Sequence, residues 1–85
     1  MEFETGTVVI SKAGRDKGYF MAVVGAEGEN LLVADGKERP LSRPKKKNPK
    51  HLQKTDRKID LEQLTDKKLR TLLGAMGRLE EKGQA

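Results

Sequence analysis

Short apolar segments separated by glycine-containing turns limit the folds open to this chain more than any other feature. Residues 6–12, 19–24 and 30–34 are each rich in β-branched or other apolar residues, and a turn with glycine follows each one. Each segment therefore predicts a β-strand. The Asp35–Gly36 pair signals a tight hairpin, because glycine tolerates the positive φ angle that such turns need. Residues 37–42 are accordingly predicted to form a fourth strand.

Strands this short, with turns this tight, favour a small, strongly curved antiparallel sheet or a barrel. Closure would remove the exposed edges that a four-stranded open sheet leaves. Pro40 cannot donate a hydrogen bond, so it is expected at an edge or a bulge. If Val8 and Ile10 of the first strand point inward, the alternation of side chains makes Thr7, Val9 and Ser11 point outward.

Positive charge is concentrated in one segment of the chain. The 85 residues carry 18 Lys and Arg against 13 Asp and Glu, a net charge of +5, and residues 43–58 hold eight of the cations beside a single Asp. Pro44 and Pro49 keep this segment extended, and residues 51–55 can form a short fifth strand. A nucleic acid would offset the repulsion among these cations. An anionic membrane surface and a solvated loop without a ligand are the alternatives.

The character of the chain changes at Asp60. Leucine and methionine then recur at helical spacing, at Leu61, Leu64, Leu69, Leu72, Leu73, Met76 and Leu79. Thr65 is a suitable N-cap, and Asp66 is well placed in the first turn. We predict a linker over 56–64 and an amphipathic helix over 65–85 whose end frays from residue 80. Its apolar stripe either folds back onto the β domain or binds a partner.

Composition excludes several classes of function. The chain has no Cys and one His, His51, which excludes disulfides, thiolate metal sites, cysteine nucleophiles and His-rich metal sites. We find no catalytic Ser/His/Asp set and no P-loop, so we expect no enzyme, cofactor, metal or small-molecule substrate. No apolar run approaches the roughly 20 residues of a membrane span, and the acidic start lacks the features of a secretory signal. We expect a cytoplasmic protein that does not enter a membrane.

Two blocks of the sequence resemble known families. The segment Ser11-Lys12-Ala13-Gly14-Arg15-Asp16-Lys17-Gly18, between two apolar runs, resembles a KOW motif, a strand–loop–strand unit of ribosomal proteins and transcription elongation factors. The later block Arg43-Pro44-Lys45-Lys46-Lys47-Asn48, followed by Lys50-His51-Leu52, is similar to the "fourteen-e" family of archaeal and eukaryotic large-subunit ribosomal proteins. It is closer still to short bacterial KOW-domain RNA-binding proteins. The resemblance covers residues 5–55, and residues 56–85 depart from it.

The resemblance implies a small SH3-like antiparallel β-barrel over residues 1–55, which includes the basic segment 43–54. It also implies binding of structured RNA, with ribosomal RNA favoured and ribosomal or transcription proteins as further partners. The candidate RNA contacts are Lys12, Arg15, Lys17, Arg39, Arg43, Lys45, Lys46, Lys47, Lys50, His51 and Lys54.

An extended segment stiffened by Pro44 and Pro49 can lay successive lysines along a line of phosphates. Tyr19 and Phe20 are adjacent and face opposite sides of a strand, so one is expected in the core. Tyr19 is the candidate for stacking on a base. A protein–protein adaptor that uses the barrel groove or the tail helix, and a double-stranded DNA binder, are the alternative functions.

Overall fold

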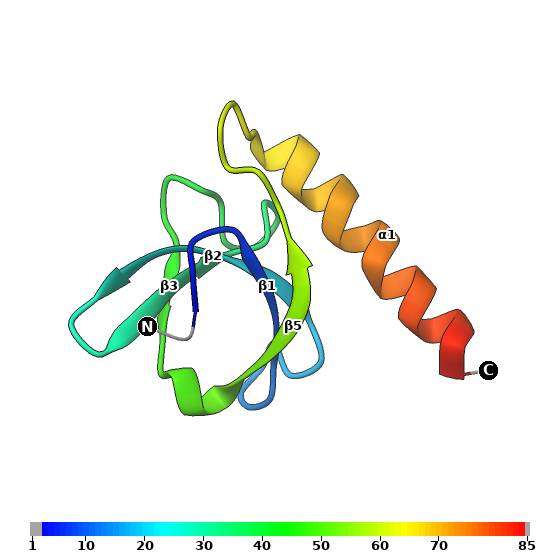
Figure 1. Cartoon of the computed structure of the whole chain (residues 1–85), viewed down its shortest axis with the longest axis horizontal. Coiled ribbons are helices and arrows are strands. Elements are labelled where there is room, and N and C mark those ends of the chain that lie inside the picture. Colours follow the sequence, from blue (N-terminus) through cyan, green and yellow to red (C-terminus); the bar gives the residue numbers. More distant parts are fainter. Residues whose placement is uncertain (1–2, 85) are drawn as a thin grey trace.

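The chain forms a curved β-sheet with one helix packed across it (Figure 1). The computed structural model describes the backbone of residues 3–84 and the side chains of residues 3–76. The elements in chain order are β1 (Thr7–Ser11), β2 (Phe20–Glu27), β3 (Asn30–Ala34), β4 (Lys45–Lys47), the single 3-10 turn η1 (Pro49–His51), β5 (Leu52–Lys58) and α1 (Asp66–Gln84). The prediction of a mainly β fold followed by a C-terminal helix is confirmed.

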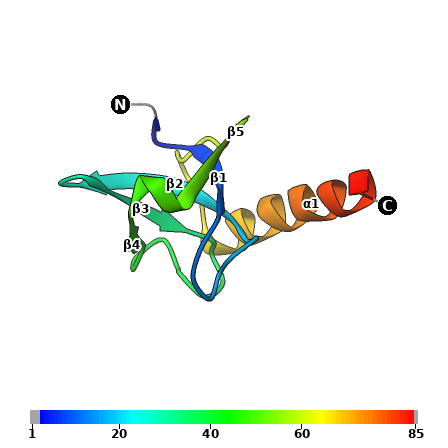
Figure 2. The ribbon, with the colours of Figure 1, turned by 90° about the horizontal axis from the view of Figure 1, so that it is seen from below.

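The five strands form one antiparallel sheet in the order β4-β3-β2-β1-β5. The two edge strands, β4 and β5, are connected through Asn48 and η1, so the sheet must curl to bring its edges toward each other (Figures 1 and 2). Within residues 3–84, β4 and β5 are not paired with each other. The sheet is therefore open along that line.

The predicted strand over 37–42 is wrong. The Asp35 carboxylate accepts the N–H groups of Lys37 and Arg39, both at 2.9 Å, and the Arg39 carbonyl accepts the N–H groups of Asp35 and Gly36. These local hydrogen bonds close a tight loop, and they use backbone N–H and C=O groups that a strand would need for pairing. The fourth strand forms later, at β4, where Lys45 lies opposite Val33 of β3.

The predicted end of the second strand at Gly25 is also wrong, because β2 continues to Glu27. The pairing of β2 with β3 shifts register between Val23 and Gly25. A Cβ atom at Gly25 would lie 3.4 Å from the Leu32 side chain of β3. The glycine thus lies at an irregularity within the strand, a place where a missing side chain is useful.

Both faces of the sheet are buried, so the outward position expected for Thr7, Val9 and Ser11 is wrong. One face holds a cluster of Val9, Met21, Val23, Leu31, Val33 and Leu52, against which Phe3 packs. The other face contributes Val8, Ala22 and Ala34 to a second cluster with Ile59, Leu69 and Leu73. Because Leu69 and Leu73 of α1 are buried there, the apolar stripe of the helix folds back onto the sheet. The stripe position Leu79 lies outside the described side chains.

The helix begins as predicted and the linker is shorter than predicted. Thr65 is the N-cap of α1, because its hydroxyl oxygen accepts the N–H of Lys68 at 3.2 Å. The strand β5 continues to Lys58, so the first residues of the predicted linker over 56–64 belong to the sheet. The backbone of α1 is helical to Gln84, and the fraying expected from residue 80 stays a prediction. Within residues 3–84, no helix combines the length and the apolar character that a membrane span requires.

Candidate nucleic-acid interface

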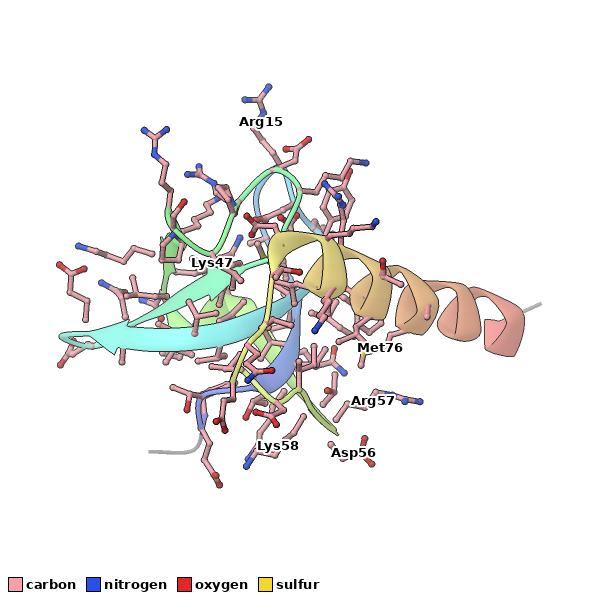
Figure 3. All side chains as sticks on the ribbon, turned by 90° about the horizontal axis from the view of Figure 1, so that it is seen from above. Arg15, Lys47, Asp56, Arg57, Lys58 and Met76 are labelled. Atoms are coloured by element: carbon pink, nitrogen blue, oxygen red, sulfur yellow. The ribbon has the colours of Figure 1, made fainter. Side chains whose placement is uncertain are left out.

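The connection between β1 and β2 is a compact, exposed basic loop, which we call the β1–β2 loop (residues 12–19). Hydrogen bonds close its base: the N–H of Gly18 donates to the Ser11 carbonyl at 2.7 Å, and the N–H of Ser11 donates to the Tyr19 carbonyl at 3.0 Å. Gly14 has a φ angle of +86°, which L side chains rarely adopt. The loop exposes three predicted cations, Lys12, Arg15 and Lys17. Arg15 extends away from the body of the protein (Figure 3).

The one carboxylate of this loop, Asp16, points inward and holds the loop to β4. One oxygen accepts hydrogen bonds from the Ser11 hydroxyl at 2.7 Å and the Lys47 ammonium at 2.5 Å, and the other lies 3.3 Å from the Lys45 ammonium. The Lys47 ammonium also donates to the Ala13 carbonyl at 3.0 Å. The side chains of Asp16 and Lys47 are only 13% and 6% exposed. A buried ion pair thus fixes the loop.

The charge on Asp16 is strongly stabilised. Burial by itself raises the pKa of this carboxyl, but the hydrogen bonds from Lys47, Ser11 and Lys45 outweigh burial and lower the pKa from 3.8 to about 2. Asp16 is therefore ionised at neutral pH, and its charge is met inside the protein by Lys47. The exposed surface of the β1–β2 loop then carries only positive charge.

The expected line of phosphate contacts along Lys45, Lys46 and Lys47 is corrected by the structure. These residues form β4, and successive side chains of a strand point to opposite faces. Lys45 and Lys47 both reach Asp16, whereas Lys46 lies 3.4 Å from Glu27 of β2. Lys47 is buried and has no surface to offer a phosphate. Its role is to hold the loop, and sequence reasoning missed this pairing because Asp16 lies 31 residues earlier in the chain.

The short turn η1 brings two more of the predicted RNA contacts, Lys50 and His51, to the β1–β2 loop. The side chain of Asn48 caps η1 by accepting the N–H of Lys50 at 2.9 Å. The N–H of Lys12 donates to the carbonyl of His51 at 2.8 Å, so η1 and the loop lie at the same end of the molecule (Figure 1). Lys50 and His51 are both exposed. We call these exposed residues the loop cluster: Lys12, Arg15, Lys17, Lys50 and His51.

The remaining predicted contacts lie elsewhere. Arg39 and Arg43 are exposed on the connection between β3 and β4, which we call the β3–β4 loop (residues 35–44), and Lys54 is exposed on the edge strand β5. Tyr19 ends the β1–β2 loop with 53% of its surface exposed, while Phe20 packs against the cluster beneath α1. Tyr19 is thus the aromatic residue of this pair that a base could reach.

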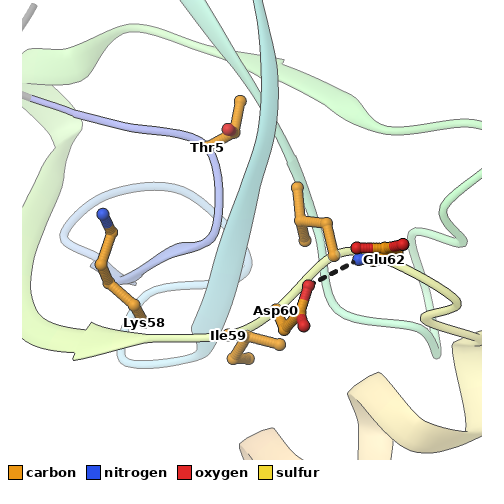
Figure 4. A pocket seen from close by; sticks show the side chains of 6 residues that line it. Thr5, Lys58, Ile59, Asp60 and Glu62 are labelled. Carbon is orange, nitrogen blue, oxygen red and sulfur yellow. Dashed lines mark hydrogen bonds between the residues drawn. The ribbon is translucent and has the colours of Figure 1, made fainter.

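Two hollows lined by described residues do not include any residue of the loop cluster. One, of about 420 Å³, is lined by Thr5, Lys58, Ile59, Asp60, Leu61 and Glu62 (Figure 4). Lys58 lies on the opposite side of the molecule from Arg15 (Figure 3). Among the described side chains, no group of three or more His, Asp and Glu residues could hold a metal ion. The chain matches no protein-family model, so a functional assignment rests on the geometry of the loop cluster.

Proposed function

We propose that this protein is a non-enzymatic RNA-binding module that holds structured RNA, ribosomal RNA above all, through the loop cluster. The observation that carries the proposal is the internal pairing of Asp16 with Lys47, because it leaves the exposed face of the β1–β2 loop wholly basic. A group of exposed lysine and arginine side chains on an anchored loop, without a nearby exposed carboxylate, attracts a dense line of negative charge. The phosphate backbone of a nucleic acid is such a line.

The chemistry of the loop cluster suits phosphate in two ways. Lysine ammonium groups act as point charges, while Arg15 can bind a phosphate bidentately or stack on an unpaired base. The N–H groups of Gly14 and Arg15 have no backbone acceptor among the described residues, and exposed N–H groups of a turn can donate to phosphate oxygens. Tyr19 adds an exposed ring beside these donors, suited to a base that is not paired.

The proposal includes the finer fold that the resemblance implies, an SH3-like barrel of the KOW type. The short connection through Asn48 and η1 supports it, because it brings the two edge strands β4 and β5 near each other, although they are not paired within the described residues. The resemblance to the "fourteen-e" ribosomal proteins and to the short bacterial KOW-domain proteins supports RNA as the nucleic acid.

A titration against a fluorescent stem–loop from large-subunit ribosomal RNA tests the proposal. We expect the triple variant Lys12→Gln, Arg15→Gln, Lys17→Gln to bind more weakly. The negative slope of log affinity against log salt should become shallower by about 2.7, because each of the three lost phosphate contacts contributes about 0.9 to its steepness.

A matched control removes three exposed cations outside the loop cluster, Arg57, Lys58 and Lys68, and should keep the slope of the wild type. The proposal would be refuted if the two triple variants lost the same amount of affinity, or if the affinity of the wild type did not depend on salt. Competition by double-stranded DNA as strong as by RNA would make the protein a general nucleic-acid binder.

A protein–protein adaptor is the second candidate function, and one surface favours it. A groove of about 330 Å³ between the end of β5 and α1 is lined in part by Ile59, Leu64, Leu72 and Met76, and Leu72 is 42% exposed. Nuclease treatment of a purified complex with ribosomal proteins separates the two functions. Loss of the proteins after nuclease favours RNA binding, whereas their retention, together with release by Leu72→Glu, favours the adaptor.

A further inference from the structure

The first turns of α1 are fixed against the β3–β4 loop. The Asp66 carboxylate accepts the N–H of Leu41 at 2.7 Å. Gly36 lies so close to the helix that a Cβ atom there would be 3.1 Å from the backbone nitrogen of Arg70 and would clash with the carbonyl oxygen of Asp66. The loop that carries Arg39 and Arg43 is thus held beside the start of the helix.

The pitch of α1 gives its exposed surface two different flanks. Leu69 and Leu73 face the sheet. At 100° per residue, Lys67 and Arg70 lie on the flank next to Gly36 and the β3–β4 loop. Lys68 and Leu72 lie on the other flank, where both line the groove at the end of β5.

The flank beside the β3–β4 loop is basic. Lys37, Arg39, Arg43, Lys67 and Arg70 are all exposed there. Three carboxylates share this region: Asp35 and Asp66 accept backbone N–H groups of the β3–β4 loop, and Glu38 is exposed. The five cations still outnumber them. Among the described side chains, neither Lys67 nor Arg70 forms an ion pair.

The opposite flank has a different balance of charge. Lys58 and Lys68 line the groove together with Asp60 and Glu62, and the Lys58 ammonium is already 2.7 Å from the Glu4 carboxylate. Cations and carboxylates are therefore mixed there, and the attraction for a polyanion is weaker than on the flank of Lys67 and Arg70.

We propose that this flank of α1 also contacts the RNA, where Lys67 and Arg70 bind phosphates of the same RNA that the loop cluster holds. The β1–β2 loop and η1 lie at one end of the sheet and the β3–β4 loop lies at the other (Figure 1), so this RNA spans both ends. This inference rests on the proposed function. The helix then has two roles: its buried face completes the core, and its basic flank adds phosphate contacts beside Arg39 and Arg43. The part of the chain that departs from the resembled families would thus extend the footprint on RNA.

The test compares two double variants with the same change in charge. Lys67→Gln with Arg70→Gln removes the proposed contacts, and Lys58→Gln with Lys68→Gln removes two cations from the other flank. Glutamine keeps a helix propensity close to that of lysine and arginine. Both variants are first checked for an unchanged thermal unfolding midpoint and then titrated with the fluorescent ribosomal stem–loop across a range of salt.

For the Lys67/Arg70 variant, we expect the slope of log affinity against log salt to be shallower than that of the wild type by about 1.8. Between about 50 and 200 mM salt, its affinity should then fall about 12-fold less than that of the wild type. The Lys58/Lys68 variant should match the wild type. If the affinity of the wild type falls with salt as expected and the two variants have the same slope, the inference is overturned while the proposed function stands. If the wild type fails to bind, both are overturned.

Discussion

Replacing Asp16 with asparagine leaves the Lys47 ammonium buried without a counter-ion. The size of the resulting loss of stability follows from the pKa of the Asp16 carboxyl, which falls from 3.8 to about 2 on folding. That fall corresponds to about 2 kcal/mol of stabilisation of the charged form, and Asp16 is 13% exposed, so solvent screens it little. Removal of one member of a buried pair costs about 3–5 kcal/mol when the other charge stays buried. We expect Asp16→Asn to lower the free energy of unfolding by about 2–4 kcal/mol.

Urea unfolding followed by circular dichroism at pH 7 measures this loss. Asp56→Asn is a matched control, because Asp56 is exposed on β5 and its replacement should change stability by about 0.5 kcal/mol or less. The double variant Asp16→Asn, Lys47→Met should be more stable than the two single losses together predict, because the aliphatic methionine leaves no buried charge.

The pH dependence gives the sharper criterion. A carboxyl whose pKa is lowered on folding stabilises the protein above its unfolded pKa, near 3.8, and this stabilisation disappears as the pH falls toward the folded pKa, about 2. The difference in stability between the wild type and Asp16→Asn should therefore be full above about pH 4 and small at about pH 2. A difference that stays constant over this range would refute the assignment of Asp16 as a charged anchor.

Three further substitutions test other contacts. Gly36→Ala should lower the thermal unfolding midpoint, because its Cβ would clash with the carbonyl oxygen of Asp66; an unchanged midpoint would contradict the packing of α1 on the β3–β4 loop. Thr65→Ala removes the N-cap of α1 and should cost about 1 kcal/mol in urea unfolding, whereas Thr71→Ala, at an exposed helix position, should cost less. Leu69→Ala removes a side chain with 0% exposure and should cost about 2–5 kcal/mol; a cost near that of Leu72→Ala would contradict the burial of this face.

The sequence alone determined the features that depend on neighbouring residues. The strands near residues 7–11 and 30–34, the helix after Thr65 and the concentration of charge in residues 43–58 follow from β-branched runs, turn glycines, helical spacing and counts. It also placed Lys12, Arg15 and Lys17 together on one loop, because a short turn between two strands leaves them no other place.

Tertiary structure alone decided that Lys45–Lys47 form the strand β4 and where their side chains lie. Three consecutive lysines carry no apolar pattern that predicts a strand, yet β4 pairs with β3 with Lys47 opposite Leu31. That register directs Lys47 inward to Asp16, and the same pairing turns Lys46 to the other face. Likewise, the burial of both sheet faces required α1 to cover one of them. The physical reason is the distance along the chain over which each interaction acts. Apolar runs and helical spacing involve residues near each other in sequence, whereas the partner of a buried charge is set by the pairing register of strands that are far apart in sequence.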